Sequence, residues 1–187
     1  MTIYYIYCQI TCHMLVLYIL LGVIALFLLV AALAGTRWHY EQSILIQAPP
    51  EKVWPNISSL RAINQWNPWM ERDPNVKVTY TDKDGTPGAG FSWDSPVKNV
   101  GAGSQTILKV TDHAEVATRV DFFRPFKGTG LANFRIGSEN AATRVTWSMK
   151  SSMPYPMNIV KVFGGIKRNM GRDFSKGLNK LKGICES

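Results

Sequence analysis

Residues 157–182 carry the pattern that most restricts the fold of this chain. Their apolar side chains recur at steps of three and four, so at about 100° per residue they fall on one side of a helix. This apolar side is formed by Ile159, Phe163, Ile166, Met170, Phe174, Leu178 and Leu181. The opposite side carries the basic residues Lys161, Arg168, Arg172, Lys176 and Lys180. The pattern predicts an amphipathic helix, which has to cover another element of the fold.

Four glycines interrupt this predicted helix, at positions 164, 165, 171 and 177. A glycine inside a helix costs about 1 kcal/mol relative to alanine. Two explanations are open at this point. Either bare backbone is needed where the helix passes close to a sheet or a ligand, or the helix is kinked or broken at Gly164 and Gly165.

The other end of the chain contains an uncharged apolar stretch at residues 14–34. A hydrocarbon core of about 30 Å needs about 20 such residues as a helix. We therefore expect a transmembrane helix at residues 14–35, preceded by an N-terminal extension at residues 1–13, with Met1 or Met14 as the start. A cleaved signal peptide is the competing interpretation, because Ala32, Leu33 and Ala34 resemble an A-x-A cleavage site. The missing basic n-region and the length of the apolar stretch favour a retained anchor.

Charge and cysteine usage restrict the partners. No charged residue precedes Arg37, so the net charge of +8 belongs to the rest of the chain. Arg37 and Lys52 follow the apolar stretch, which favours a cytoplasmic domain by the positive-inside rule. The basic residues lack an aromatic-basic nucleic-acid pattern, so we expect no nucleic-acid partner. They either form a solvated helix face or contact anionic lipid headgroups. The three cysteines show neither a disulfide framework nor a metal pattern.

Residues 42–183 predict one α+β domain, joined to the apolar helix by a linker at residues 36–41. The β-branched and aromatic runs, separated by turn signals, predict strands at residues 42–47, 76–81, 90–94, 103–112, 115–123, 128–137 and 143–150. Two short helices are expected between the first two strands, one starting at Pro50 and one at residues 60–66. The later connections are too short for crossover helices, so the sheet should be antiparallel. The C-terminal helix can then cover one face of it.

Six sequence motifs resemble those of a known family. They are I-L-I-Q-A-P-P-E-K-V-W at 44–54, W-N-P-W at 66–69, F-S-W-D-S at 91–95, D-F-F-R-P-F at 121–126, V-T-W-S-M at 145–149 and G-R-D-F-S-K-G-L-N-K-L at 171–181. Together they resemble the polyketide cyclase/dehydrase branch of the START-like (SRPBCC) superfamily. The resemblance implies a helix-grip fold, in which a curved seven-stranded antiparallel sheet wraps the C-terminal helix and leaves a hydrophobic cavity. Similar members are often single-span proteins of bacteria, so a bacterial inner-membrane location is expected.

The cavity implied by this resemblance leads to a set of expected ligand contacts. Large aromatic side chains can line an apolar pocket or simply pack as core. The expected contacts are Trp69, Trp93, Phe122, Trp147, Met170 and Phe174. The leading hypothesis is a membrane-anchored module that binds a hydrophobic small molecule or lipid.

The alternative hypothesis is an enzyme of the cyclase or dehydratase type. Its acid-base candidates are Asp94, Arg119, Asp121 and Arg144, and they would have to converge inside the cavity. The sequence shows no histidine-centred triad and no zinc-ligand spacing. We therefore predict no catalytic residue, no metal and no cofactor. A third hypothesis, an assembly factor that acts through protein contacts, has no motif for or against it.

Overall fold

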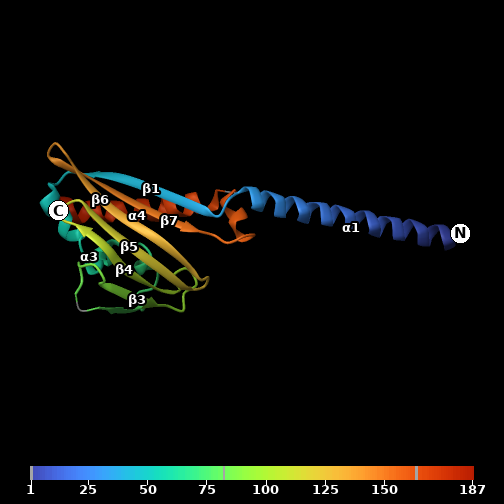
Figure 1. Ribbon diagram of the computed structural model, residues 1–187, viewed down its shortest axis with the longest axis horizontal. Coiled ribbons are helices and arrows are strands. Elements are labelled where there is room, and N and C mark those ends of the chain that lie inside the picture. Colours follow the sequence, from blue (N-terminus) through green and yellow to red (C-terminus); the bar gives the residue numbers. More distant parts are fainter. Residues whose placement is uncertain (1, 82, 163) are drawn as a thin grey trace.

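A computed structural model describes residues 2–81, 83–162 and 164–187 of the chain. It begins with one helix, α1 (Thr2–Leu33), which projects away from a folded domain (Figure 1). The segment His13–Leu33 is long and apolar enough to cross a membrane, and its side chains are largely exposed. The predicted apolar helix is therefore present, and it also includes most of the predicted N-terminal extension.

The domain is built on one seven-stranded sheet. All neighbouring strands are antiparallel, and their order is β1-β7-β6-β5-β4-β3-β2. The strands are β1 (Arg37–Ile46), β2 (Lys77–Tyr80), β3 (Gly90–Asp94), β4 (Ala102–Thr111), β5 (Glu115–Arg124), β6 (Gly128–Glu139) and β7 (Ala142–Ser152). The predicted seven-stranded antiparallel sheet is confirmed, with strand ends within a few residues of those expected except at β1.

The first strand begins earlier than predicted. β1 pairs with β7 from Arg37 opposite Ser152 to Ile46 opposite Thr143, so residues 37–41 belong to the sheet rather than to a linker. Exposure alternates along these residues, and Trp38 and Tyr40 are half-buried on the inner face. Aromatic residues favour strands, which agrees with the inclusion of Trp38 and Tyr40 in β1.

Four short helical segments follow β1, and the first three lie at the end of the domain away from α1. They are α2 (Pro50–Val53), η1 (Trp54–Asn56), α3 (Leu60–Trp66) and η2 (Met70–Arg72). α3 has the predicted bounds, and the hydroxyl of Ser59 caps it by accepting from the Ala62 amide at 3.1 Å. Trp66 is fully buried, and its Nε1 donates to the Asn56 carbonyl at 2.9 Å. α2, η1 and α3 close the far end of the domain, whereas η2 lies along α4, where Arg72 pairs with Asp173.

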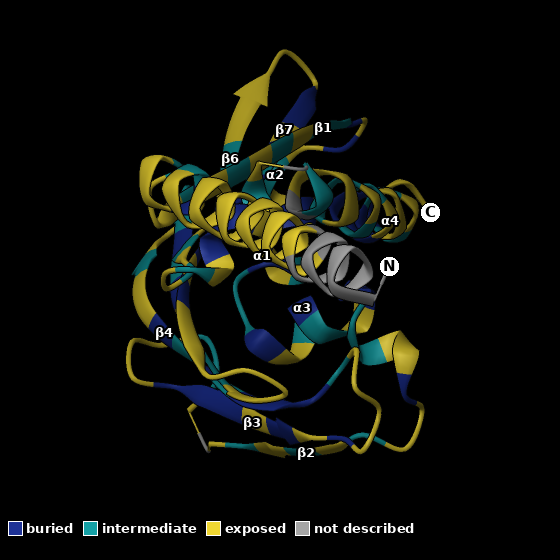
Figure 2. Cartoon of the chain, turned by 90° about the vertical axis from the view of Figure 1, so that its right-hand side faces the viewer, coloured by how far each residue is buried: buried dark blue, intermediate teal, exposed yellow. Residues whose placement is uncertain are grey.

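The C-terminal helix lies against the inner face of the curved sheet (Figure 2). Of the two alternatives for residues 157–182, the break at Gly164 and Gly165 is the one observed, because the chain forms η3 (Met157–Lys161) and then α4 (Gly165–Glu186). Gly164 precedes α4 with φ of 67°, a left-handed conformation that residues with a Cβ rarely adopt. The side of α4 that faces the core is formed by Phe174, Leu178, Leu181 and Cys185, all buried. The predicted amphipathic packing is confirmed for Phe174, Leu178 and Leu181, while Phe163 and the side chain of Ile166 lie outside the described residues.

Gly177 shows why bare backbone is needed inside α4. A Cβ atom at this position would lie 3.1 Å from Trp147 Cζ3 and from Pro68 Cδ, and 3.4 Å from Trp66 Cε3. The two explanations for the glycines therefore apply at different positions. Gly164 breaks the helix, and Gly177 allows α4 to approach the sheet and the W-N-P-W segment.

The junction between α1 and the domain is held by side chains of η3. The buried Asn158 donates through Nδ2 to the carbonyls of Ala31 at 2.6 Å and Gly35 at 2.8 Å. The ammonium of Lys161 donates to the carbonyls of Ala34, Gly35 and Arg37, the last at 2.6 Å. The last carbonyls of a helix lack partners within the helix and carry partial negative charge. Asn158 and Lys161 therefore cap α1 and fix η3 beside its exit.

Replacement of Gly177 by leucine tests the close approach of α4. We expect Gly177→Leu to lower the free energy of unfolding by about 3 kcal/mol or more, because the larger side chain collides with packed rings. Chemical denaturation of the full chain in detergent micelles, followed by tryptophan fluorescence, measures this change.

The matched control is Gly183→Leu in the same helix, where a Cβ has open space. This variant should lose no stability, since leucine is the better helix former by up to about 1 kcal/mol. Equal unfolding free energies for the two variants would contradict the close packing at Gly177.

Candidate ligand-binding site

The six predicted ligand contacts come together between the sheet and α4. Trp93 lies on β3, Phe122 on β5 and Trp147 on β7, while Met170 and Phe174 lie on α4. The sixth, Trp69, immediately precedes η2. All six belong to one apolar cluster, in which Trp93, Trp147 and Phe174 are buried and the other three are half-buried. Their role as ligand contacts stays a prediction, and their positions are compatible with it.

A stack of aromatic rings occupies the centre of this cluster. The rings of Trp147 and Phe174 are nearly parallel, with centroids 3.9 Å apart. Trp69 meets both rings edge-on, at 5.6 Å from Trp147 and 6.3 Å from Phe174. Such edge-to-face contacts are favourable arrangements of aromatic rings. Trp69, Trp147 and Phe174 therefore pack against one another in the centre of the domain, as expected if they serve as core residues.

Two of the three half-buried members of the cluster, Phe122 and Met170, lie nearer the end where α1 joins the domain. Phe122 pairs with Gly128 at the start of β6, and Met170 lies in the N-terminal half of α4. Phe122 also meets Trp93 edge-on at 6.1 Å. An apolar molecule that reaches the Trp147 stack from this end would first contact Phe122 and Met170.

One buried polar atom in the cluster has no partner. Nε1 of Trp147 has no hydrogen-bond acceptor, although the residue is only 3% exposed. The indoles of Trp66 and Trp93, by contrast, donate to the carbonyls of Asn56 and Val100. A buried donor without an acceptor costs about 1–3 kcal/mol. The Trp147 indole is therefore ready to donate to an acceptor atom that enters the cluster.

Two further polar side chains on the inner face were missed from the sequence. Gln105 and Thr118 are buried, and Gln105 Nε2 donates to Thr118 Oγ1 at 2.9 Å. Thr118 Oγ1 donates in turn to the carbonyl of Ala132. Strand alternation places Gln105 on the same face as Ile107, so this pattern could have identified it.

The four acid-base candidates do not converge inside the domain. Asp94 is exposed and accepts from Arg124, and Arg144 is exposed and donates to Glu139 at 2.7 Å. Arg119 donates to Asp121 at 3.0 Å on the outer face of the sheet. The hydrogen bond from Thr129, assisted by Arg119, holds the pKa of Asp121 below its usual range. These residues form surface ion pairs and are not brought to one reaction site.

The described residues contain neither a metal-binding cluster nor a reactive thiol at Cys185. No group of three or more His, Cys, Asp or Glu side chains lies within metal-binding reach among the described residues. Burial raises the pKa of the Cys185 thiol, which suppresses the reactive thiolate.

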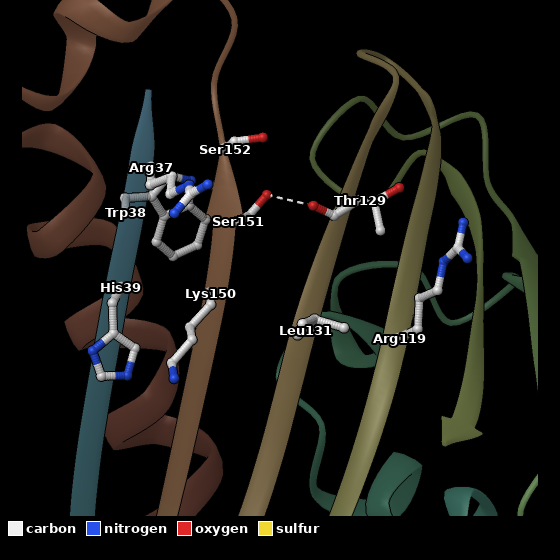
Figure 3. Close-up of a pocket in the computed structure, with 9 residues that line it drawn as sticks. All are labelled: Arg37, Trp38, His39, Arg119, Thr129, Leu131, Lys150, Ser151 and Ser152. Carbon is white, nitrogen blue, oxygen red and sulfur yellow. Dashed lines mark hydrogen bonds between the residues drawn. The ribbon is translucent and has the colours of Figure 1, made fainter. Parts of the chain in front are cut away.

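A groove of about 670 Å³ lies on the outer face of the sheet, close to the junction with α1 (Figure 3). Its lining includes Arg37, Arg119, Leu131 and Lys150, which come from β1, β5, β6 and β7. None of the six predicted ligand contacts lines this groove. It is a separate, basic surface feature.

Ion pairs hold the segment that carries Trp69 against α4. Glu71 accepts from Lys176 at 2.6 Å and also from Lys180, while Arg72 pairs with Asp173. Hydrogen bonds from Lys176 and Lys180 lower the pKa of Glu71. The basic side of α4 is thus partly used for these pairs rather than being free.

Comparison with known proteins agrees with the architecture. The fold is similar to that of protein CV1439 from Chromobacterium violaceum, with a TM-score of 0.57 and 13% identity, covering 80% of this chain and 97% of that one. It is also similar to protein MLL2253 from Mesorhizobium loti, with a TM-score of 0.56 and 17% identity, covering 79% of this chain and 96% of that one. Identities this low establish a shared fold alone. No curated protein matches the sequence.

The curved antiparallel sheet around a C-terminal helix defines a domain of the START-like helix-grip class. Residues 37–186 match the model of the family described as polyketide cyclase/dehydrase and lipid transport, and the chain belongs to this family. The predicted family and fold are confirmed. The matched range also begins at Arg37, in agreement with the observed start of β1.

Replacement of Glu71 by glutamine tests the ion pairs behind Trp69. Because its folded-state pKa is lowered from an ordinary value of 4.5, the charge of Glu71 stabilises the fold above that pH. We expect Glu71→Gln to cost about 1 kcal/mol or less at neutral pH. The cost should disappear as the pH falls through the lowered pKa. Urea denaturation of the full chain in micelles at several pH values measures this dependence.

The control is Glu51→Gln at the exposed start of α2, which should have little effect at any pH. A cost for Glu71→Gln that stayed constant down to pH 2.5 would show that the ion pairs are not its source.

Proposed function

We propose that this protein is a membrane-anchored binding module that holds a hydrophobic small molecule or lipid between the sheet and α4. The observation that carries the proposal is the unpaired Nε1 of Trp147, a buried donor inside an aromatic cluster. Small-molecule sites are typically apolar, with a few polar groups that fix the orientation of the ligand. Trp147 supplies such a group in the middle of the predicted contacts.

The surrounding residues indicate the chemistry of this ligand. An apolar body suits Trp93, Phe122 and Met170, which present ring faces and a flexible thioether. A hydrogen-bond acceptor suits the Trp147 indole, which can only donate. A carboxylic acid, ester or ketone with a hydrocarbon or ring body meets both requirements. The family description, which includes lipid transport, supports this class of ligand.

Membrane anchoring is the second part of the proposal. α1 has the length and composition of a membrane span, and Asn158 and Lys161 fix its C-terminal end to the domain. The domain would then remain beside a bilayer, which is a reservoir of apolar molecules. The cytoplasmic side of a bacterial inner membrane stays a prediction, based on Arg37, Lys52 and the family resemblance.

No observation on this chain favours the cyclase or dehydratase alternative. That hypothesis required Asp94, Arg119, Asp121 and Arg144 to face the interior, and all four face outward in surface pairs. The family name alone does not assign a reaction, because one fold hosts many functions.

Binding of the fluorescent fatty acid cis-parinaric acid tests the proposed role of Trp147. The full chain, stripped of bound lipid in detergent, should bind the probe, and Trp147→Phe should weaken binding about tenfold. In this variant the new phenyl ring still stacks on Phe174, but the N–H donor is lost. Because a hydrogen bond to a charged group such as the probe carboxylate is worth about 1.5–3 kcal/mol, its loss accounts for a decrease of this size.

The matched control is Trp54→Phe, a buried tryptophan that stacks on His113 at the far end of the domain. It should leave probe binding unchanged. Equal probe affinities for the wild-type chain and Trp147→Phe would show that the Trp147 indole does not bind the ligand. If neither the wild-type chain nor any variant bound the probe, the proposed function would be contradicted.

A further inference from the structure

Exposed apolar side chains outside α1 gather at one end of the domain. Among the described residues after α1, nine large apolar side chains are exposed. Seven of them lie in residues 95–101, in residues 123–128, and in residues 153–162 with 164–168, which together we call the α1-side rim. These seven are Val97, Phe123, Phe126, Tyr155, Met157, Val160 and Val162. Phe126 is the most exposed of them, at 75%.

Strand pairing places the three parts of this rim at the same end of the sheet. Asp94 pairs with Ala102 and Ala102 with Arg124, so the connections after β3 and after β5 are neighbours. Arg37, which follows α1, pairs with Ser152, which precedes the third part. The rim therefore surrounds the end of the domain from which α1 leaves (Figure 1).

The charge of the rim is entirely basic. Its charged residues are Lys98, Arg124, Lys127, Lys161, Lys167 and Arg168, and it contains no aspartate or glutamate. Lys161 caps α1, and Arg124 pairs with Asp94. Within the part of the chain that the structure describes, no acidic side chain pairs with Lys98, Lys127, Lys167 or Arg168. The basic groove lined by Arg37 and Lys150 adjoins the rim on the outer face (Figure 3).

The opposite end of the domain carries charges of both signs. Its turns, at residues 81, 83–89, 112–114 and 140–141, contain Asp84, Asp112 and Lys83, and the neighbouring α2 and α3 contain Glu51, Lys52 and Arg61. None of the exposed large apolar side chains lies in these far-end turns among the residues that are described. Apolar and basic groups thus occur together at one end only, which random exposure of surface residues does not explain.

We propose that the α1-side rim is a second membrane-contact surface, which docks on the anionic headgroups of the bilayer that α1 spans. Apolar side chains flanked by Lys and Arg suit the headgroup region, where the apolar part enters the acyl boundary and the basic part binds anionic lipid. A protein partner is disfavoured because α1 places the rim beside a membrane surface.

Docking of this rim would give the proposed ligand site an entrance from the bilayer. Phe122 and Met170, two of the three half-buried site residues, lie nearer the end of the domain that carries the rim. A lipid-like molecule could then pass between the bilayer and the cluster without crossing water. The inference rests on the membrane anchoring in the proposed function, and it adds that the domain lies on the bilayer.

Hydrogen exchange of the full chain in lipid nanodiscs tests the docking. The informative segments are residues 95–101 and 123–128, because they are distant in sequence from α1. Their amides should exchange at least about fivefold more slowly in nanodiscs with phosphatidylglycerol than in phosphatidylcholine alone, since one basic side chain contributes about fivefold to binding at an anionic surface. High salt should remove the difference.

The variant that tests the charges is Lys98→Glu combined with Lys127→Glu, which should abolish the slower exchange. Lys83→Glu in the far-end turns is the control and should leave it intact. Exchange of the core strands reports whether each variant is folded. Equal rates for both rim segments in the two lipids would overturn the inference. Slow amide exchange of α1 in the same nanodiscs reports whether α1 is inserted, independently of rim docking. Probe binding in detergent tests the proposed ligand site and depends on neither α1 insertion nor rim docking.

Discussion

The close contact between α4 and the inner face of the sheet is the interaction on which the rest of the structure depends. Gly177 brings the helix against Trp147 and Pro68, and three residues earlier Phe174 stacks on the same indole at 3.9 Å. This contact places the aromatic cluster between the two layers and removes Nε1 of Trp147 from solvent. The core that stabilises the domain is thus also the proposed binding site.

The two ends of the domain differ in surface character, and α1 is attached to one of them. Asn158 binds the Ala31 carbonyl in the last turn of α1, and Lys161 binds the carbonyls of Ala34, Gly35 and Arg37 that follow this helix. These bonds fix which end of the sheet lies nearest to α1. The basic residues and exposed apolar side chains are concentrated at that end. α2, η1 and α3 close the other end, and Trp66 at the end of α3 is fully buried. Only one end is therefore suited to exchange apolar molecules with a bilayer.

The regular parts of the fold could be predicted because their signals are local. Alternation and turn residues predicted seven strands, six of them with ends within two residues of those observed. The helix at residues 60–66 has the expected bounds, and the spacing of Phe174 and Leu178 identified the buried side of α4. The six aromatic and Met positions were also placed in one cluster by pattern and family resemblance.

The features that sequence reasoning missed depend on contacts between distant residues. The cap on α1 joins Asn158 to Gly35 across 123 residues, and no local pattern indicates it. The inclusion of residues 37–41 in β1 depends on pairing with β7. That Trp147 lacks an acceptor while Trp93 has one depends on the position of the Val100 carbonyl, which only the folded chain defines.

The central claim is that the cluster around Trp147 holds an apolar molecule with a hydrogen-bond acceptor. Native mass spectrometry of the full chain, released from gentle detergent directly after purification from membranes, tests it most directly. We expect a bound molecule of defined mass at one per chain, which organic extraction identifies as an apolar compound with a carbonyl or carboxylate. A chain that is consistently empty, and that stays empty after incubation with membrane lipid extract, would contradict the account.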